Sequence, residues 1–216
     1  MIGVKLRVWG EYACFTRPEM KVERVSYDVI TPSASRAIIE SIYWKPSIRW
    51  IIDRIHVMKP VKFDNIRRNE LGAKLSTQAI NKGINNGESV EIFIEDNRQQ
   101  RASMILRDVE YVIEAHFEAV DDDGENIGKH LDMFNRRAEK GQCFGQPYLG
   151  TREFSASFEL IDEIPLSCFS GGKDLGFMLY DMDFKDKKNI QPMFYRPKMV
   201  DGVIDVPHPD SLEVLR

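Results

Sequence analysis

The sequence has few residues that could cross-link the chain or bind a metal ion. Its three cysteines, Cys14, Cys143 and Cys168, lie far apart and are odd in number, which argues against a disulfide framework and against a close metal-binding pair. The four histidines, at positions 56, 116, 130 and 208, show no paired metal-ligand spacing. We therefore expect no metal and no cofactor, and this cysteine usage favours a reducing, cytoplasmic location.

Long apolar runs are also missing. No stretch approaches the roughly 20 apolar residues that a membrane-spanning helix needs. The segment from Met1 to Trp9 carries Lys5 and Arg7 within an alternating pattern, unlike a signal peptide. We expect no membrane association. With 216 residues, 43% hydrophobic and 30% charged, the composition is typical of a globular chain with one large or two small domains.

Charge is spread unevenly along the chain. The formal net charge is −4, which by itself argues against nucleic-acid binding. Residues 1–82, however, hold 15 Lys and Arg against 8 Asp and Glu, a balance of +7, whereas residues 83–216 hold 15 against 26, a balance of −11. The basic half could face phosphates, although an imbalance of this size can also be plain solvated surface.

Apolar spacing predicts an order of elements. Alternation or helical periodicity indicates a strand at 1–9, a helix at 32–45, a strand at 48–58, a long strand or strand pair at 101–120 that ends at Asp121 to Gly124, a helix at 127–140 and a strand at 154–158. Thr31 and Pro32 suit the N-cap and first position of the first helix, which Pro46 ends. The polar segment 64–97 is predicted to be a loop or a short insertion.

This order is that of an α+β, ferredoxin-like fold, the layout of RNA-recognition-motif domains. We expect a ferredoxin-like domain over residues 1–160, with an insertion around 64–97, followed by a small C-terminal antiparallel β domain over 161–216. The fold hosts many functions and does not assign one.

Two side chains lie off the apolar faces of their predicted elements. In the first helix, Tyr43 lies opposite the apolar stripe that runs from Ala34 to Ile42. In the long strand, His116 alternates with Glu114 and Glu118, while the odd-numbered neighbours are apolar. Both side chains should therefore be accessible. An exposed tyrosine or histidine is more often ordinary surface than a functional group.

Four stretches of the sequence resemble one known family. They are Ser35-Arg36-Ala37-Ile38-Ile39-Glu40-Ser41-Ile42-Tyr43-Trp44-Lys45-Pro46, Pro147-Tyr148-Leu149-Gly150-Thr151-Arg152-Glu153-Phe154, Leu179-Tyr180-Asp181-Met182-Asp183-Phe184 and Met199-Val200-Asp201-Gly202-Val203-Ile204. Together they resemble the CRISPR-associated Cas five family in its subtype I-C (Dvulg, "d") form, a RAMP-superfamily group. The stretches span nearly the whole chain.

The resemblance implies a metal-independent endoribonuclease that cuts precursor CRISPR RNA near the base of the repeat hairpin, by attack of a 2′-hydroxyl. Such a protein stays bound to the 5′ handle of the product. The implied partners are CRISPR repeat RNA, the backbone and large subunits of a subtype I-C surveillance complex and, as a further candidate, target DNA. The N-terminal ferredoxin-like domain would then be the RNA-binding and catalytic one.

The resemblance also implies a catalytic set, namely a tyrosine at the end of the first helix and a Lys-His pair on a later strand. Tyr43 and His116 match these positions in the predicted elements. The lysine does not match, because Ala115 precedes His116. A nearby arginine or lysine from the basic half would have to stabilise the charge of the transition state.

The chemistry assigns each group a role. Cleavage needs an aligned 2′-hydroxyl, a base, an acid for the 5′-oxygen and a cation for the phosphorane. His116, beside two glutamates that favour its protonated form, suits the general acid, and Tyr43 suits alignment of the 2′-hydroxyl. Trp44 and Trp50 are expected in the core. The candidate phosphate contacts are Arg36, Lys45, Arg49, Arg67 and Arg68.

Two other interpretations stay open. The chain could be a non-catalytic subunit that binds the 5′ handle of the CRISPR RNA, which the missing lysine supports. Alternatively, it could be a ferredoxin-like metabolic or regulatory protein in which Tyr43 and His116 are surface residues. Incubation of labelled repeat RNA with the purified protein in chelator is the experiment that would discriminate best among these interpretations.

Overall fold

A computed structural model describes residues 3–120, 127–184, 186 and 188–216. The predicted strand end at Asp121 to Gly124 lies outside the described residues. Within them the fold is a mixed α/β arrangement built on a large antiparallel sheet, as the sequence indicated. No described helix is long and apolar enough to cross a bilayer.

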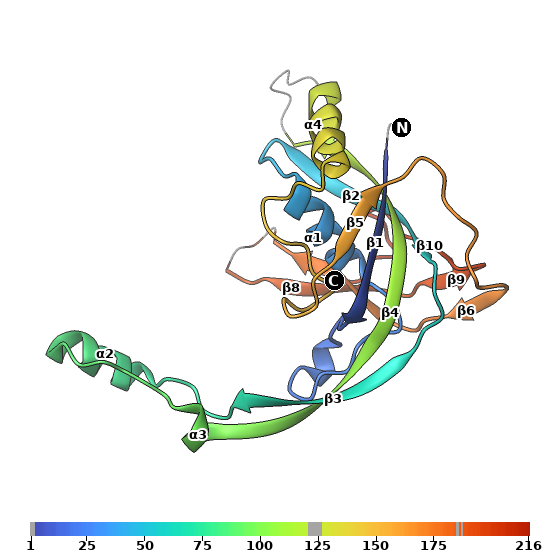
Figure 1. Cartoon of the computed structure of the whole chain (residues 1–216). Helices are drawn as coiled ribbons and strands as arrows, with labels where there is room; N and C mark the ends of the chain where they lie inside the picture. Colours follow the sequence, from blue (N-terminus) through green and yellow to red (C-terminus); the bar gives the residue numbers. More distant parts are fainter. Residues whose placement is uncertain (1–2, 121–126, 185, 187) are drawn as a thin grey trace.

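The large sheet has eight strands among the described residues (Figure 1). Along the main path, the strands lie in the order β5 (Ser157–Leu160), β1 (Val4–Ala13), β4 (Arg98–Ala119), β2 (Ile48–Val57), β10 (Val203–Asp205), β9 (Lys198–Val200) and β6 (Gly172–Asp174). The eighth strand, β3 (Phe63–Leu71), pairs with β4 alone. The 22-residue strand β4 is central, because it pairs with β1 and β2 through its C-terminal half and with β3 through its N-terminal half.

Two helices cover one face of this sheet. Helix α1 (Pro32–Ile42) begins as predicted, with the Thr31 hydroxyl accepting a hydrogen bond from the Ala34 N–H at 3.2 Å. Helix α4 (Ile127–Glu139) packs beside it and places Phe134 in the core. Phe134 contacts Trp50 of β2, with ring centroids 5.0 Å apart. The predicted core position of Trp50 is confirmed, since its side chain is 1% exposed.

The segment between β2 and the C-terminal half of β4 forms an arm (Figure 1). It extends away from the rest of the protein, which we call the body. It consists of β3, α2 (Thr77–Asn86), α3 (Ile94–Asn97) and the N-terminal half of β4. The prediction of a loop is therefore wrong over β3, α2 and α3, whereas the strand predicted at 101–120 covers most of β4. Because the segment is polar, its local pattern did not indicate the long antiparallel pairing of β3 with β4, which runs from Phe63↔Leu106 to Leu71↔Arg98. It also did not indicate helix α2, which has Ser76 as its N-cap and Gly87 as its C-cap, with a φ of 68° that suits glycine.

Residues after 160 add strands to the large sheet. β10 pairs with β2 at Val203↔His56, and β9 and β6 follow it. The remaining strands, β7 (Met178–Asp183) and β8 (Gln191–Tyr195), form a separate two-stranded sheet, with β7 in contact with α1. A short 3-10 helix, η1 (Pro18–Met20), completes the described elements. The division into domains 1–160 and 161–216 stays a prediction.

Candidate active site

Tyr43 is the C-cap residue of α1, and its ring is buried. The helix ends at Ile42, and Tyr43 has an extended backbone with φ −151° and ψ 123°. The helical phase used to predict its direction therefore stops one residue before it. The prediction that Tyr43 is accessible is wrong, because its side chain is 4% exposed and lies among the core residues.

The Tyr43 phenol is hydrogen-bonded to His130 in α4. The distance from Tyr43 Oη to His130 Nδ1 is 2.8 Å, and His130 is also 4% exposed. The two rings lie 5.9 Å apart, and the Phe117 ring packs edge-on against His130 at 6.0 Å. The structure therefore joins the end of α1 to the beginning of α4 through a phenol–imidazole pair, in which either group can donate the proton.

Two basic residues of α4 belong to the surroundings of this pair. The Arg137 guanidinium lies 5.2 Å from the centroid of the Tyr43 ring, and its Nη1 donates to the Ile42 carbonyl at 3.0 Å. Arg137 follows His130 by seven residues, so both project from one face of α4. Lys129, directly before His130, is exposed. Arg137 therefore places a positive charge against the Tyr43 ring.

Trp44 and Lys45 are exposed directly after Tyr43, with Trp44 at 53%. The predicted core position of Trp44 is therefore wrong, since the chain turns outward after the helix cap. An exposed indole beside a lysine can contact RNA bases and phosphates. Both side chains therefore lie in solvent next to the buried Tyr43 in the chain.

His116 lies on the opposite face of the sheet. Its neighbour Phe117 faces the helices, so alternation directs His116 away from them, as predicted. It is nevertheless only 8% exposed, because its Nδ1 donates to the Asp53 carboxylate at 2.8 and 2.9 Å. A pocket of about 610 Å³ that also contains Lys5 and Glu114 opens beside it. Tyr43 and His116 therefore do not form one site.

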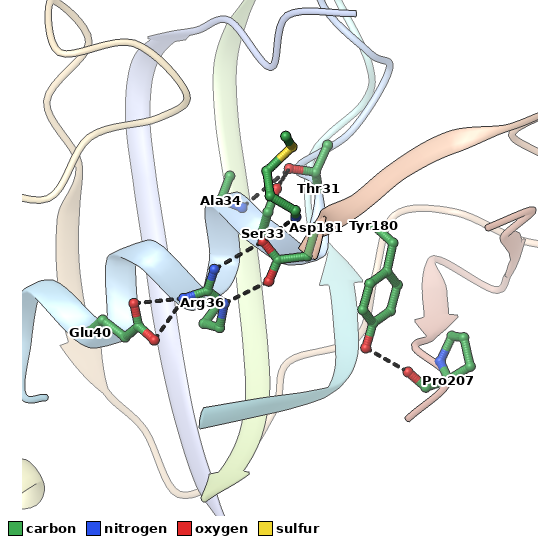
Figure 2. Close-up of polar contacts among 9 residues, drawn as sticks. Thr31, Ser33, Ala34, Arg36, Glu40, Tyr180, Asp181 and Pro207 are labelled. Atoms are coloured by element: carbon green, nitrogen blue, oxygen red, sulfur yellow. Dashed lines mark hydrogen bonds and ion pairs between the residues drawn. The ribbon is translucent and has the colours of Figure 1, made fainter. Parts of the chain in front are cut away.

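Arg36 is held in ion pairs (Figure 2). Its Nε and Nη2 donate to the two Asp181 oxygens at 2.8 and 2.9 Å, and its Nη1 donates to Glu40 at 2.7 Å. Burial alone would lower the pKa of Arg36, but these carboxylates raise it above its ordinary value. Arg36 thus fastens α1 to β7, and the prediction that it contacts phosphate is replaced by this structural role.

A pocket of about 360 Å³ lies beside this ion pair and is lined in part by Arg49, Trp50 and Tyr180. The Tyr180 hydroxyl donates to the Pro207 carbonyl at 2.9 Å (Figure 2), and burial raises its pKa. Arg49 is exposed and stays a candidate for phosphate contact, as does Lys45.

Arg67 and Arg68 point to opposite faces of the arm. Arg68 is paired with Glu153 and Glu70, and its Nη2 donates to Ser103 Oγ at 3.0 Å. Arg67 is exposed on the other face of β3. The alternation of a strand separates adjacent residues in this way. Only Arg67 is therefore presented to a ligand.

The chain was compared with known proteins. The family model described as CRISPR-associated protein (Cas_Cas5), in its Cas5d form, matches residues 3–207. The chain belongs to the Cas5d family. A relative from Mannheimia succiniciproducens, named CRISPR pre-crRNA endoribonuclease Cas5d, is 52% identical over 99% of this chain and 98% of its own length.

A second Cas5d relative of the same name comes from Thermus thermophilus. It is 39% identical over 100% of this chain and 96% of its own length. Among solved structures, one described as the crystal structure of a CRISPR-associated protein covers 100% of this chain and 97% of its own, with a TM-score of 0.71 and 24% identity. This last likeness bears on the Cas5d fold alone.

Sequence reasoning missed His130 and Lys129. The resemblance implied a Lys-His pair, and the sequence contains one such dipeptide, Lys129-His130. It lies in the first turn of α4 rather than on a strand, so a search along the predicted strands selected His116 instead. A direct search for the dipeptide would have found this pair as a further candidate beside His116.

Proposed function

We propose that this chain is a CRISPR pre-crRNA endoribonuclease whose active site contains Tyr43, His130 and Lys129. The observation that carries the proposal is the 2.8 Å hydrogen bond between the Tyr43 phenol and the His130 imidazole, with a lysine directly before the histidine. The names of the two Cas5d relatives, which match this chain over nearly its full length, support the activity.

The reaction uses the 2′-hydroxyl of the RNA as its nucleophile. That oxygen loses its proton and bonds to the adjacent phosphorus, the bond from phosphorus to the 5′-oxygen breaks, and the 5′-oxygen takes up a proton. The products are a 2′,3′-cyclic phosphate and a 5′-hydroxyl. The protein must align the nucleophile, exchange two protons and stabilise the charge on the phosphorane.

The residues of the site suit these tasks. Tyr43, fixed by its hydrogen bond, orients the 2′-hydroxyl, and His130 exchanges protons because imidazole changes charge near neutral pH. Lys129 and Arg137 supply the positive charge that stabilises the phosphorane. The proposal includes cleavage in the presence of chelator, since these side chains and the RNA supply every reacting group.

The proposal extends to the RNA path and to the partners. Lys45, Arg49 and Arg67 are the exposed basic residues that would contact phosphates of the repeat and of the 5′ handle. The backbone and large subunits of a subtype I-C surveillance complex are the proposed protein partners, and target DNA is a further one. The sheet order β5-β1-β4-β2, with α1 and α4 on one face, supports the ferredoxin-like assignment of the N-terminal part.

The proposal is tested with repeat RNA from the protein's own locus, labelled and incubated with purified protein in chelator. We expect one cut near the hairpin base, with a cyclic or 3′-phosphate on one product and a 5′-hydroxyl on the other. Tyr43→Phe should slow the cut by about 10² to 10⁴-fold. A single deoxynucleotide on the 5′ side of the scissile phosphate should abolish it, because the nucleophile is then missing.

Four outcomes would contradict this proposal. Strict dependence on magnesium or a 5′-phosphate product would overturn the mechanism. Full activity of Tyr43→Phe would move the site elsewhere. A wild-type protein that binds its repeat tightly but cuts no RNA would favour the non-catalytic subunit that binds the 5′ handle.

A further inference from the structure

Phe144 lies in the loop after α4, and its side chain is 96% exposed. Phenylalanine is among the residues most often buried in folded proteins. A fully exposed phenyl ring therefore needs either a reason in the fold or a ligand. The fold provides none, since no described ring packs within stacking or edge-on distance of Phe144.

The backbone around Phe144 is nevertheless fixed. Its N–H donates to the Ser41 carbonyl in α1 at 2.7 Å. On one side, Cys143 packs against the core; on the other, Gln146 Nε2 donates to the Ala156 carbonyl at 3.1 Å. The turn that leads into the loop is closed by Gly141, with φ 62°, and by the Gln142 N–H, which donates to the Arg137 carbonyl at 2.8 Å. The ring is thus presented from an ordered loop.

These bonds place Phe144 next to the Tyr43–His130 pair. Ser41, which accepts the Phe144 N–H, lies two residues before Tyr43 and three before the exposed Trp44, so at most about 10 Å of extended chain separates Ser41 from Trp44. Arg137 connects the Phe144 loop with the Tyr43–His130 pair. Its carbonyl accepts a hydrogen bond from the Gln142 N–H of the loop, and its guanidinium lies over the Tyr43 ring.

The surroundings suit nucleic acid better than protein. Residues 128–152 contain five Lys and Arg against two Asp and Glu, a balance of +3 in a chain of net charge −4. The exposed residues that directly follow Phe144, Gly145 and Gln146, are not apolar, and the other exposed aromatic side chain that the backbone hydrogen bonds place nearby is Trp44. Exposed aromatic side chains in a basic segment are the arrangement that holds unpaired bases and their phosphates.

We infer that Phe144 is a stacking platform for an unpaired base of the repeat RNA next to the scissile phosphate. This inference rests on the proposed function and adds how the substrate is positioned. The stacked base fixes the register of the RNA strand, so that the neighbouring 2′-hydroxyl reaches Tyr43. Phe144 is a binding and positioning residue and takes no part in proton transfer.

The test uses repeat RNA that carries a deoxynucleotide at the cut, so that binding is measured without cleavage. Base–aromatic stacking is worth about 1–3 kcal/mol, and 1.4 kcal/mol is tenfold, so Phe144→Ala should raise Kd by about 5- to 140-fold. Phe144→Trp should keep the affinity. Because the ring is fully exposed, neither change should move the melting temperature. On cleavable RNA, KM should rise more than kcat falls.

A second arm identifies the base. 2-Aminopurine is placed in turn at each unpaired position beside the cut, and its fluorescence should be quenched at one position by the wild type but not by Phe144→Ala. With an abasic nucleotide at that position, wild type and Phe144→Ala should bind equally. Phe177→Ala is the matched control, since this ring is also exposed, at 57%, but belongs to the segment that leads into β7.

The outcomes separate this inference from the proposed function. A wild type that binds and cuts, with Phe144→Ala indistinguishable from it, overturns the stacking platform and leaves the nuclease intact. The same holds if Phe144→Ala binds RNA normally but no longer associates with backbone or large subunits, because the ring would then contact protein. A wild type that binds no repeat RNA overturns both.

Discussion

His130 and His116 lie on opposite faces of the same sheet and have similar degrees of burial. Each has its Nδ1 in a hydrogen bond, His130 to the Tyr43 phenol and His116 to the Asp53 carboxylate. Their surroundings differ in charge. His130 has a lysine directly before it in the chain and Arg137 on the same helical face, whereas His116 has glutamates at Glu114 and Glu118 on its own strand face.

The difference shows what a phosphate would meet on each side. Near His130, the charged neighbours are basic, which favours a phosphate. Near His116, the glutamates on its strand face disfavour one. We therefore expect the two histidines, which look equivalent in the sequence, to differ as nuclease groups. The decisive property is the charge of the groups around each ring, which only the folded chain brings together.

The first prediction compares the two histidines directly. His130→Gln should reduce kcat for repeat cleavage by about 10² to 10⁴-fold, because glutamine can hydrogen-bond Tyr43 but cannot exchange a proton. His116→Gln should leave kcat within a few-fold of the wild type. Single-turnover cleavage of labelled RNA measures both, and binding to deoxy-substituted RNA shows that each variant still holds its substrate. The reverse ranking would return the catalytic role to His116.

The second prediction compares two arginines that the sequence treated alike. Arg36→Ala should lower the free energy of unfolding by about 2–4 kcal/mol, because it leaves Asp181 and Glu40 without their partner in a mostly buried setting. Arg49→Ala should change stability by less than about 0.5 kcal/mol, as expected for an exposed side chain, and should weaken RNA binding instead. Urea unfolding and RNA titration measure the two effects. If Arg36→Ala and Arg49→Ala unfold with the same free energy, the ion pairs of Arg36 contribute little to stability.

The third prediction separates Arg67 from Arg68 and has the smallest effect. Arg67→Ala should lower the slope of log affinity against log salt by about 0.7, the value for one lost contact to single-stranded nucleic acid. Arg68→Ala should leave this slope unchanged, because Arg68 is occupied by Glu153 and Glu70. Titrations of repeat RNA at several salt concentrations provide the measurement. A changed slope for Arg68→Ala alone would place the RNA on the other face of the arm.

Much of the fold could be predicted from local pattern. The apolar spacing found α1, β1, β2, the body half of β4 and α4, because each buries one regular face against the same core. The arm was not found, since β3 is stabilised by pairing with the distant half of β4 rather than by an apolar face of its own. Long-range pairing of this kind leaves little trace in a local window.

The site was only half predicted. Tyr43 is where the resemblance expected it, but its burial was missed because the helix ends before it and the ring turns inward. His130 was missed because it lies on a helix, whereas the resemblance directed attention to a strand, and because its partner Tyr43 is 87 residues away in the chain. The ion pairs of Arg36 with Asp181 and of Arg68 with Glu153 are equally long-range, so exposure of a basic residue could not be judged from the sequence.

Strand β4 is one continuous chain segment in both the arm and the body, and this has a mechanical consequence. The paired part of the arm, from Arg98 to Leu106, is about 30 Å long at about 3.4 Å per residue, and Asp108, whose φ of 54° is uncommon for a residue other than glycine, lies between it and the part of β4 that pairs with β2. A change of backbone conformation at Asp108 would therefore change the direction of the arm relative to the central sheet.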